Sequence, residues 1–433
     1  MKQLFLLAIL LASTLPSFSQ ANQRRCGTFD IIEYREQMAP GYKQRVNACL
    51  DNARHIINQN EASRAANDTV YRIQVVFHVV YGTAAENIPD SVILSQVEVL
   101  NEDYRRLNAD TVNTRQEFLP VAADTKIEFY LAQTDPDGNP TTGITRTAGN
   151  GGIIGFNPFQ DNVKSEPGGK APWPTDRYVN IWVCNVLNGF GILGYAFPPS
   201  NAPNWPAGST TDSALQGIVL HYPVVGRNFS DPIDVTVTRG RSLSHEMGHY
   251  LGLRHIWGDS VGCNNDDGIE DTPFASDASQ QTCNLSINSC PDAGTDFQDM
   301  IENYMDYSDD RCLNMFTQGQ ADIMRTMLQT SRAGVATIET TTSIKNAAQN
   351  FQSVQVFPNP STGTVYLNAQ LKNGGTYTYQ VYNAIGEMLA GEYNLSSVYN
   401  HRSIDMSAQP AGIYFIKVTS GEQVVVKKVQ VTR

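Results

Sequence analysis

The chain has 433 residues, more than one ordinary domain requires, and this length predicts two domains with short additional segments. Apolar residues make up 41% of the sequence, which suffices for compact cores and excludes a chain that is disordered throughout. The formal net charge of −12 argues against a nucleic-acid partner, because such a partner requires a concentrated basic surface.

The N-terminus has the pattern of a signal peptide, with Lys2, an apolar stretch from Leu4 to Leu15, and the small residues Ser17 and Ser19 before Gln20. A buried N-terminal helix is the alternative. The apolar stretch is too short to span a bilayer, and no other segment approaches the roughly 20 apolar residues of a spanning helix. We therefore expect residues 1–19 to be removed on export, no transmembrane segment, and a compartment that permits disulfides.

The next segments alternate between strands and a helix. Residues 20–63 are polar with weak helical patterning, Val70–Tyr81 is β-branched and predicts a strand, and Ser91–Leu107 repeats apolar residues at helical spacing. Three further strands are predicted, at Lys126–Gln133, Tyr178–Val186 and Gly217–Val225. This half therefore has α/β or α+β character.

The remaining chain has a different composition. Residues 332–350 are rich in Thr, Ser, Ala and Asn and are predicted to be a linker. Residues 351–433 contain short strands separated by Gly and Asn, at Val354–Phe357, Thr364–Leu367, Thr376–Tyr382, Ile413–Thr419 and Val424–Val431. This pattern predicts an all-β domain.

The seven cysteines fall into groups. Cys26 and Cys49 lie near the start, and Cys184 stands alone in an apolar run, where we expect a buried thiol. Four lie within fifty residues, and in an exported chain they predict two disulfides, with three pairings open: Cys263, Cys283, Cys290 and Cys312.

The strongest chemical signal is a cluster of histidines. His245 and His249 are four residues apart on a predicted helix, so both imidazoles project from one face and can bind one metal ion. Gly252 can end the helix in the left-handed conformation and return His255 to the same ion. Three neutral imidazoles leave a fourth position for water, as in catalytic zinc sites, and Glu246 is placed to reach that water.

The sequence around these histidines resembles a known family. H-E-x-x-H-x-x-G-x-x-H is the metzincin signature, and NYMDY at 303–307 resembles the metzincin methionine turn. With LGLRHIWGD and the four clustered cysteines, roughly residues 70–330 resemble the pappalysin family. The resemblance implies an α+β metzincin zincin catalytic domain, with residues 20–63 as a latency prosegment and residues 64–331 as the catalytic domain.

The resemblance also implies residue roles. Glu246 would be the general base and then the general acid of peptide hydrolysis, with one catalytic Zn²⁺ as cofactor. Tyr307 would stabilise the transition state, although a packed core tyrosine is the alternative. Met305 and Gly252 would be structural. By the same resemblance we expect the pairs Cys263–Cys290 and Cys283–Cys312.

The first cysteine is a candidate for keeping the precursor latent. The segment from Arg24 to Gly27 (RRCG) looks like a cysteine switch, in which Cys26 binds zinc in the latent form. A Cys26–Cys49 disulfide is the alternative.

Two acidic segments have candidate roles. The loop from Asp266 to Thr272 (DDGIEDT) suits structural calcium, which relatives carry in this region, and the alternative is a solvated loop. The candidate calcium ligands are Asp267, Ile269 and Thr272. The family resemblance implies a preference for arginine after the cut, and Asp309 and Asp310 are candidates for its pocket, with solvated turn residues as the alternative.

The same preference predicts self-processing. Arg follows the bond at Ser63–Arg64, where the prosegment ends, and at Ser331–Arg332, where the catalytic domain ends. We therefore expect a mature enzyme of residues 64–331.

The C-terminal domain resembles a type IX secretion sorting domain, by VFPNPSTG at 356–363, YNAIGE at 382–387, AGIYFIKV at 411–418 and KKV at 427–429. A carbohydrate-binding sandwich is the alternative. The chain is thus expected to be a monomeric endopeptidase that is secreted or held at the outer cell surface, with protein or peptide substrates and the type IX machinery as partners. The competing hypothesis is a surface adhesin or binding module on a catalytically silent zincin fold.

Overall fold

The computed structural model describes residues 25–59, 69–149, 162–186, 192–199, 216–227, 235–280, 282–292, 294–339, 351–372, 374–384, 386–396, 402–421 and 423–432. The predicted signal peptide and the Ser63–Arg64 bond lie outside these ranges. The chain divides into two compact units, Met1–Thr340 and Thr341–Arg433.

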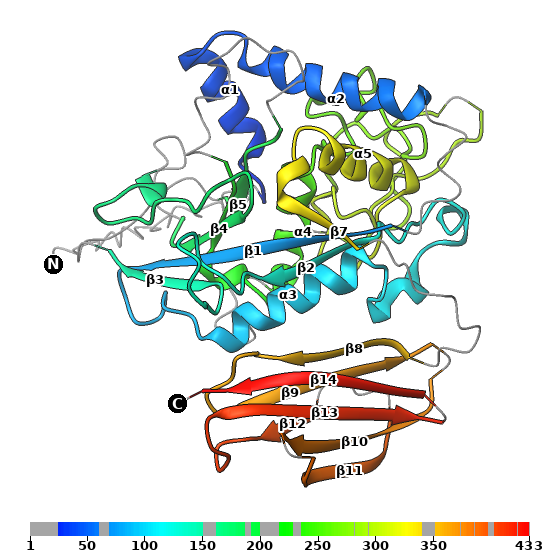
Figure 1. Ribbon diagram of the computed structural model, residues 1–433. Helices are drawn as coiled ribbons and strands as arrows, with labels where there is room; N and C mark the ends of the chain where they lie inside the picture. Colours follow the sequence, from blue (N-terminus) through cyan, green and yellow to red (C-terminus); the bar gives the residue numbers. More distant parts are fainter. Residues whose placement is uncertain are drawn as a thin grey trace, which may run out of the picture. The chain divides into compact units, whose positions relative to one another are not determined.

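The N-terminal unit combines a mixed sheet with five α-helices in its described part (Figure 1). Its helices are α1 (Thr28–Met38), α2 (Tyr42–Gln59), α3 (Asp90–Tyr104), α4 (Arg241–Tyr250) and α5 (Gln318–Gln329). Its strands are β1 (Val70–Tyr81), β2 (Ile127–Leu131), β3 (Ile144–Ala148), β4 (Val179–Cys184), β5 (Gly194–Ala196), β6 (Ile218–His221) and β7 (Ala336–Glu339).

The long strand β1 organises the sheet, whose order is β2-β1-β4-β6-β5, with β3 and β7 also pairing with β1. The pairs of β1 with β2, β3 and β4 are parallel, whereas β7 pairs with β1 and β5 pairs with β6 in antiparallel fashion. Residues Val75 to Val80 of β1 are all buried, because both faces of this parallel region are covered.

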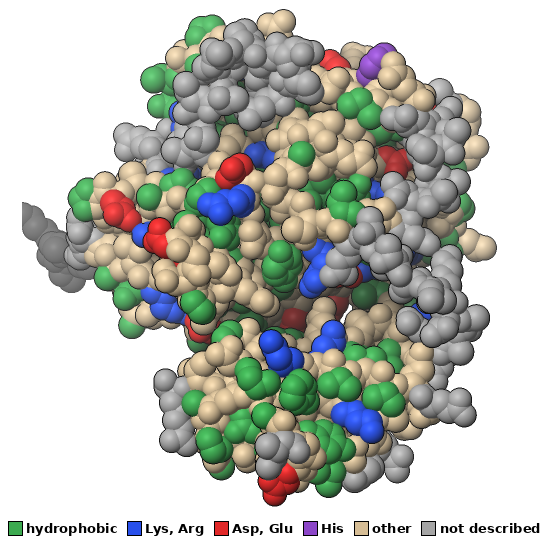
Figure 2. Space-filling view, viewed as in Figure 1, with side chains coloured by type: hydrophobic (Ala, Val, Ile, Leu, Met, Phe, Trp, Pro, Cys, Tyr) green, Lys and Arg blue, Asp and Glu red, His purple; other side chains and the backbone are tan. Residues whose placement is uncertain are grey.

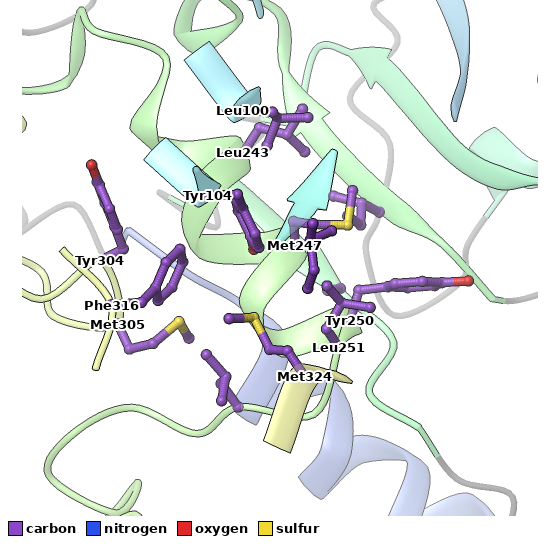
Figure 3. Packing of buried hydrophobic residues seen from close by; sticks show 14 of the residues in the cluster. Leu100, Tyr104, Leu243, Met247, Tyr250, Leu251, Tyr304, Met305, Phe316 and Met324 are labelled. Carbon is purple, nitrogen blue, oxygen red and sulfur yellow. The ribbon is translucent and has the colours of Figure 1, made fainter. Parts of the chain in front are cut away.

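Helices α3 and α4 pack against each other, and α3 also packs on β2 while α4 packs on β5 and β6. Figure 3 shows side chains from α3, α4, α5 and the turn around Met305 meeting in one core cluster. Tyr104 of α3 lies at its centre, with its ring edge-on to Phe129 and its hydroxyl donating to the Ser244 carbonyl of α4. The sheet and α3 thus fix the position of α4.

The secondary structure predicted from the sequence omits three elements. The expected strands and helix lie where β1, β2, β4, β6 and α3 form, but β3, β5 and α5 were not predicted. The predicted linker at 332–350 is wrong at its start, because residues 336–339 form β7 and pair with residues 70–73 of β1. A strand of four residues among Thr and Ala gives no alternating signal that would separate it from a linker.

The C-terminal unit consists of two antiparallel sheets that share one apolar core, so the predicted all-β sandwich is confirmed. One sheet has the order β11-β10-β13-β14 and the other β12-β9-β8. The strands are β8 (Phe351–Phe357), β9 (Thr364–Leu371), β10 (Thr376–Asn383), β11 (Met388–Ser396), β12 (Arg402–Asp405), β13 (Gly412–Ser420) and β14 (Gln423–Val431). Basic and apolar side chains lie among one another on the face of this unit seen in Figure 2.

Within the described residues, no helix combines the length and the apolar character that crossing a membrane requires.

Candidate zinc centre and active site

Three histidine side chains converge at the end of α4. The Nε2 atoms of His245, His249 and His255 lie 3.0, 3.1 and 3.2 Å apart in pairs, and all three rings are buried. Gly252 has φ +96°, the left-handed conformation that returns the chain, and a Cβ there would lie 2.9 Å from Met327. The predicted role of this glycine therefore has a structural basis.

The opposite ring nitrogens fix the orientation of these rings. Nδ1 of His245 donates to the Tyr304 carbonyl at 2.7 Å, Nδ1 of His249 donates to the Leu253 carbonyl at 2.8 Å, and Nδ1 of His255 donates to the Asp259 carboxylate. These bonds leave each Nε2 as an acceptor toward the common point, the tautomer that metal binding requires.

A buried carboxylate, Asp103, connects helix α4 with the segment around Tyr304. Asp103 of α3 accepts hydrogen bonds from Tyr304 at 2.7 Å and from Ser244 at 2.6 Å. Tyr304 binds the first histidine through its carbonyl, and Ser244 precedes that histidine in α4. Sequence reasoning missed both Asp103 and Asp259. Only Asp259 left a local signal, since it follows His255 by four residues.

Cys26 completes the donor set. Its Sγ and one nitrogen from each of the three histidines lie within 4.8 Å of one another. Tetrahedral zinc with N ligands at about 2.0–2.1 Å requires donors about 3.4 Å apart, so a His₃Cys set at this spacing fits a zinc ion. Cys26 and Cys49 are both free thiols, and Cys49 instead lies 3.6 Å from the Ser331 hydroxyl, so the structure contains no Cys26–Cys49 disulfide.

Burial determines the protonation states of His245, His249 and Cys26. It lowers the pKa of His245, and it lowers that of His249 to about 3, so the imidazoles stay neutral as metal ligands must. Burial, and then the nearby Glu246, raises the pKa of the Cys26 thiol. A thiolate at this position is therefore stable only beside a cation.

Glu246 points toward the same place and is held by the N-terminal segment. Its Oε2 accepts from the Thr28 hydroxyl at 3.0 Å and from the Cys26 thiol at 3.4 Å. Desolvation raises the pKa of Glu246 to about 8. Thr28 is a third residue of the site that sequence reasoning missed, because Thr28 and Glu246 lie 218 positions apart.

The methionine turn underlies the histidines. Met305 is fully buried, and a Cβ on Gly248 would lie 2.4 Å from its sulfur, so α4 needs glycine where it crosses this turn. The Tyr307 ring is 4.9 Å from the His255 ring, and its hydroxyl lies 3.4 Å from the Cys26 carbonyl. The phenol therefore lies beside the histidine cluster.

An arginine of the N-terminal segment is buried near the histidines. Arg25 donates to the Ser308 and Thr236 carbonyls, the latter at 2.6 Å, and its guanidinium lies 3.4 Å from the Asp310 carboxylate. Asp310 and Arg25 are 1% and 8% exposed. The other candidate, Asp309, binds the exposed Arg311 instead. Only one of the two predicted aspartates thus faces Arg25.

The predicted calcium loop brings its candidate ligands together. The Asp267 carboxylate accepts from the Thr272 hydroxyl at 2.7 Å and from the Ile269 amide at 3.0 Å through Oδ1. The Thr272 hydroxyl is also 2.7 Å from the Ile269 carbonyl. Asp267 is buried, and its Oδ2 has no hydrogen-bond partner among the described residues.

Two disulfides hold the segment between α4 and α5, Cys263–Cys290 and Cys283–Cys312, which is the pairing that the family resemblance implied. Cys184 is a buried free thiol, as expected.

Comparisons with known proteins agree with this arrangement. Residues 162–329 match the family described as pregnancy-associated plasma protein-A, and residues 355–432 match the secretion system C-terminal sorting domain. Mature mirolysin from Tannerella forsythia, solved in complex with a cleaved peptide, is 41% identical, with a TM-score of 0.55 over 62% of this chain and 96% of that one. A promirolysin mutant from the same organism is 37% identical, with a TM-score of 0.60 over 72% of this chain and 97% of that one. An extracellular metalloprotease of Pyricularia oryzae is 30% identical, covering 63% of this chain and 83% of the relative.

Proposed function

This chain belongs to the pregnancy-associated plasma protein-A family of peptidases, and from that premise we propose that it is a self-processing zymogen whose mature form cleaves before arginine. It is a secreted zinc metalloendopeptidase with a type IX sorting domain. The proposed preference for arginine is supported by one observation: the buried guanidinium of Arg25 lies against the Asp310 carboxylate. An adhesin without turnover is not favoured, since Glu246 and Met305 are both in place.

In the proposed mechanism His245, His249 and His255 hold the zinc ion, which when bound supplies Lewis acidity to the attacking water and the scissile carbonyl. Glu246 takes the proton of the attacking water and passes it to the leaving amine. The Tyr307 hydroxyl donates a hydrogen bond to the oxygen that gains charge, once the segment of Cys26 has left. The Nδ1 bonds to Tyr304, Leu253 and Asp259 keep the ligand rings from rotating during these steps.

In this proposal, three sets of contacts made by the N-terminal segment keep the precursor inactive. Cys26 takes the position that water needs, Thr28 and Cys26 engage the Glu246 carboxylate, and Arg25 fills the pocket. In this proposal the general base, the metal position and the specificity pocket are thus all blocked by three residues within the four positions 25–28.

The arginine preference follows from the acceptors in the pocket. A guanidinium has five donors in one plane, and Arg25 uses two of its nitrogens on backbone carbonyls and lies against the Asp310 carboxylate. A lysine ammonium is a single point and does not span these three acceptors. We therefore propose that a substrate arginine after the cut takes the place of Arg25.

Processing at Ser63–Arg64 remains the proposed activating cut, just after α2 ends at Gln59. The expected second cut at Ser331–Arg332 is not supported. Arg332 is buried, donates to Gln216 at 2.6 Å and to the Phe197 carbonyl at 2.9 Å, and lies 3.8 Å from the Tyr250 ring centroid. We propose that the sorting domain is instead released after β7, because a cut before β7 would also remove its pairing with β1.

We further propose a structural calcium ion at Asp267, Ile269 and Thr272. A buried carboxylate oxygen without a partner costs free energy unless a cation or proton satisfies it. A carboxylate, a carbonyl and a hydroxyl within one short loop are the oxygen ligands that calcium prefers.

The proposed function is tested by mapping the cleavage sites of the mature protein in a denatured protein mixture by mass spectrometry. Arginine should dominate the position after the cut, and the activity should disappear on treatment with 1,10-phenanthroline. Cleavage with no enrichment of arginine there would refute the specificity while leaving the peptidase assignment intact.

A further inference from the structure

Helix α1 is anchored to the catalytic unit by one apolar side chain, that of Ile31. Of the residues in α1, only Thr28 and Ile31 are buried. Helix α1 lies beside β5 (Figure 1). Ile31 is 1% exposed and belongs to an apolar cluster that includes Ile192, Tyr195 and Phe197, on and next to β5. This cluster is separate from the core around the histidines.

The segment that leads into α1 lies along the edge of the sheet. Strand β5 is the last strand in the sheet order. The Leu193 amide donates to the Arg25 carbonyl at 3.0 Å. The Gly27 amide donates to the Gly194 carbonyl at 2.8 Å. Cys26 lies with the histidines, and Arg25 lies where the residue after the cut is proposed to lie. The chain beyond Cys26 therefore covers the side that would hold substrate residues before the cut.

Two side chains of the cluster face this segment directly. A Cβ on Gly27 would lie 2.6 Å from Cδ1 of Ile192. The guanidinium of Arg35 lies 5.5 Å from the centroid of the Phe197 ring. Ile31 is four residues from both Gly27 and Arg35, and residues at this spacing share one face of a helix. Ile31 therefore projects toward Ile192 and Phe197.

The catalytic unit itself holds the Phe197 ring in place. The Lys164 ammonium lies 4.0 Å from the ring centroid, and the Tyr195 ring meets the ring edge-on at 6.3 Å between centroids. Lys164 and Tyr195 are both buried. A cation over an aromatic face and an edge-on ring both favour one orientation of the phenyl group. The apolar surface under Ile31 thus has supports that do not belong to the prosegment.

We propose that Ile192 and Phe197 form a substrate subsite on the side before the cut. Ile31 fills this subsite in the precursor, and an aliphatic side chain of the substrate fills it in the mature enzyme. This inference rests on the proposed function, because the prosegment must leave before a substrate can enter.

The position of the aliphatic residue follows from the spacing along the prosegment. Arg25 and Thr28 are at most about 10 Å apart in an extended chain, and one helical turn from Thr28 to Ile31 adds about 4.5 Å. An extended substrate advances about 3.3 Å per residue. We therefore expect the aliphatic side chain about three or four residues before the substrate arginine.

The experiment compares peptides cleaved by the mature enzyme. All carry arginine after the cut, and they differ only in isoleucine, alanine or aspartate at the third or the fourth residue before it. At one of these positions isoleucine should give a kcat/KM about tenfold above that of alanine, the order expected when most of an aliphatic side chain is buried. Aspartate should be poorer than alanine, because its charge would be desolvated without a partner.

Variants of the subsite test whether this preference belongs to the proposed residues. In Ile192→Ala the ratio of isoleucine to alanine should fall to about threefold, and Ile192→Leu should restore it. Cys184→Ala is the matched control, since Cys184 is buried in the same cluster on β4 and should leave the ratio unchanged. The ratio of arginine to citrulline after the cut should stay at the parent value in all three variants.

The two levels of the proposal fail in different ways. Equal rates with isoleucine and alanine at both positions, or an unaltered ratio in Ile192→Ala, would overturn the subsite while the preference for arginine stands. Cleavage that does not distinguish arginine from citrulline would instead contradict the proposed function.

Discussion

Replacing Asp310 with asparagine should reduce cleavage before arginine specifically. The Asp310 carboxylate is 1% exposed and lies 3.4 Å from the guanidinium of Arg25, which marks the place of a substrate arginine in the proposed complex. The asparagine keeps the shape and one acceptor oxygen, while the two backbone carbonyls of Ser308 and Thr236 stay in place. Oδ2 of Asp310 accepts from the Arg239 amide at 2.9 Å, so the asparagine oxygen keeps this bond and its NH2 group replaces the oxygen that faces the guanidinium. The variant therefore loses the charge and one acceptor toward the arginine.

The magnitude follows from the loss of one partner of a buried ion pair. The Asp310 carboxylate lies 3.4 Å from the guanidinium, and removing the charge of one partner of a desolvated pair costs about 2–3 kcal/mol. This corresponds to a fall of about 30- to 150-fold in kcat/KM. Peptides with citrulline, a neutral analogue of arginine, should lose a similar factor with the parent enzyme and little more with Asp310→Asn.

The assay compares kcat/KM of mature enzyme on peptides that differ only in arginine, citrulline or norleucine after the cut. Asp309→Asn is the matched control, since that carboxylate binds Arg311 and should leave all three values within twofold of the parent. An unchanged ratio of arginine to citrulline in Asp310→Asn, or an equal loss in Asp309→Asn, would refute the assignment of the pocket.

Three other predictions follow from the same contacts. Glu246→Ala should abolish casein cleavage while zinc content, measured by atomic absorption, stays near one per chain. In a precursor with its activating cut blocked, Cys26→Ala should show peptidase activity, whereas Cys49→Ala should stay latent, because only the first thiol joins the histidines. Burial lowers the pKa of His78 to about 4 from 6.5, so its neutral form contributes about 3 kcal/mol above pH 6.5 that is lost as the pH falls through 4. Urea denaturation between these pH values should show a shallower loss in His78→Gln than in the parent, and the exposed His55→Gln should behave as the parent does.

The parts of the site that could be predicted from sequence are those in which chemistry and spacing are local. His245, Glu246 and His249 share one helical turn, and Gly252 and His255 follow within six residues. Local spacing fixes their relative positions almost without reference to the rest of the fold. Strand β1 and helix α3 could be predicted for the same reason, since a β-branched run and an apolar repeat at helical spacing are both local patterns.

The missed contacts join residues that are distant in the chain. Asp103 meets Tyr304 across 201 positions, and Thr28 meets Glu246 across 218. No local pattern distinguishes such a carboxylate or hydroxyl from a surface residue. Strand β5 was missed because three buried residues are too few to show a period, although its Gly194 pairs with Cys26 and guides the segment to the site.

The two disulfides also tie catalysis to the compartment. Cys263–Cys290 and Cys283–Cys312 overlap along the chain and span 27 and 29 positions of a region with little regular secondary structure, between α4 and α5. Each such cross-link contributes about 3–4 kcal/mol by restricting the unfolded chain. The Asp267 loop and Asp310 both belong to this cross-linked region. Reduction of both disulfides should therefore loosen the region that carries Asp310, so an oxidising compartment favours the ordered pocket independently of the prosegment.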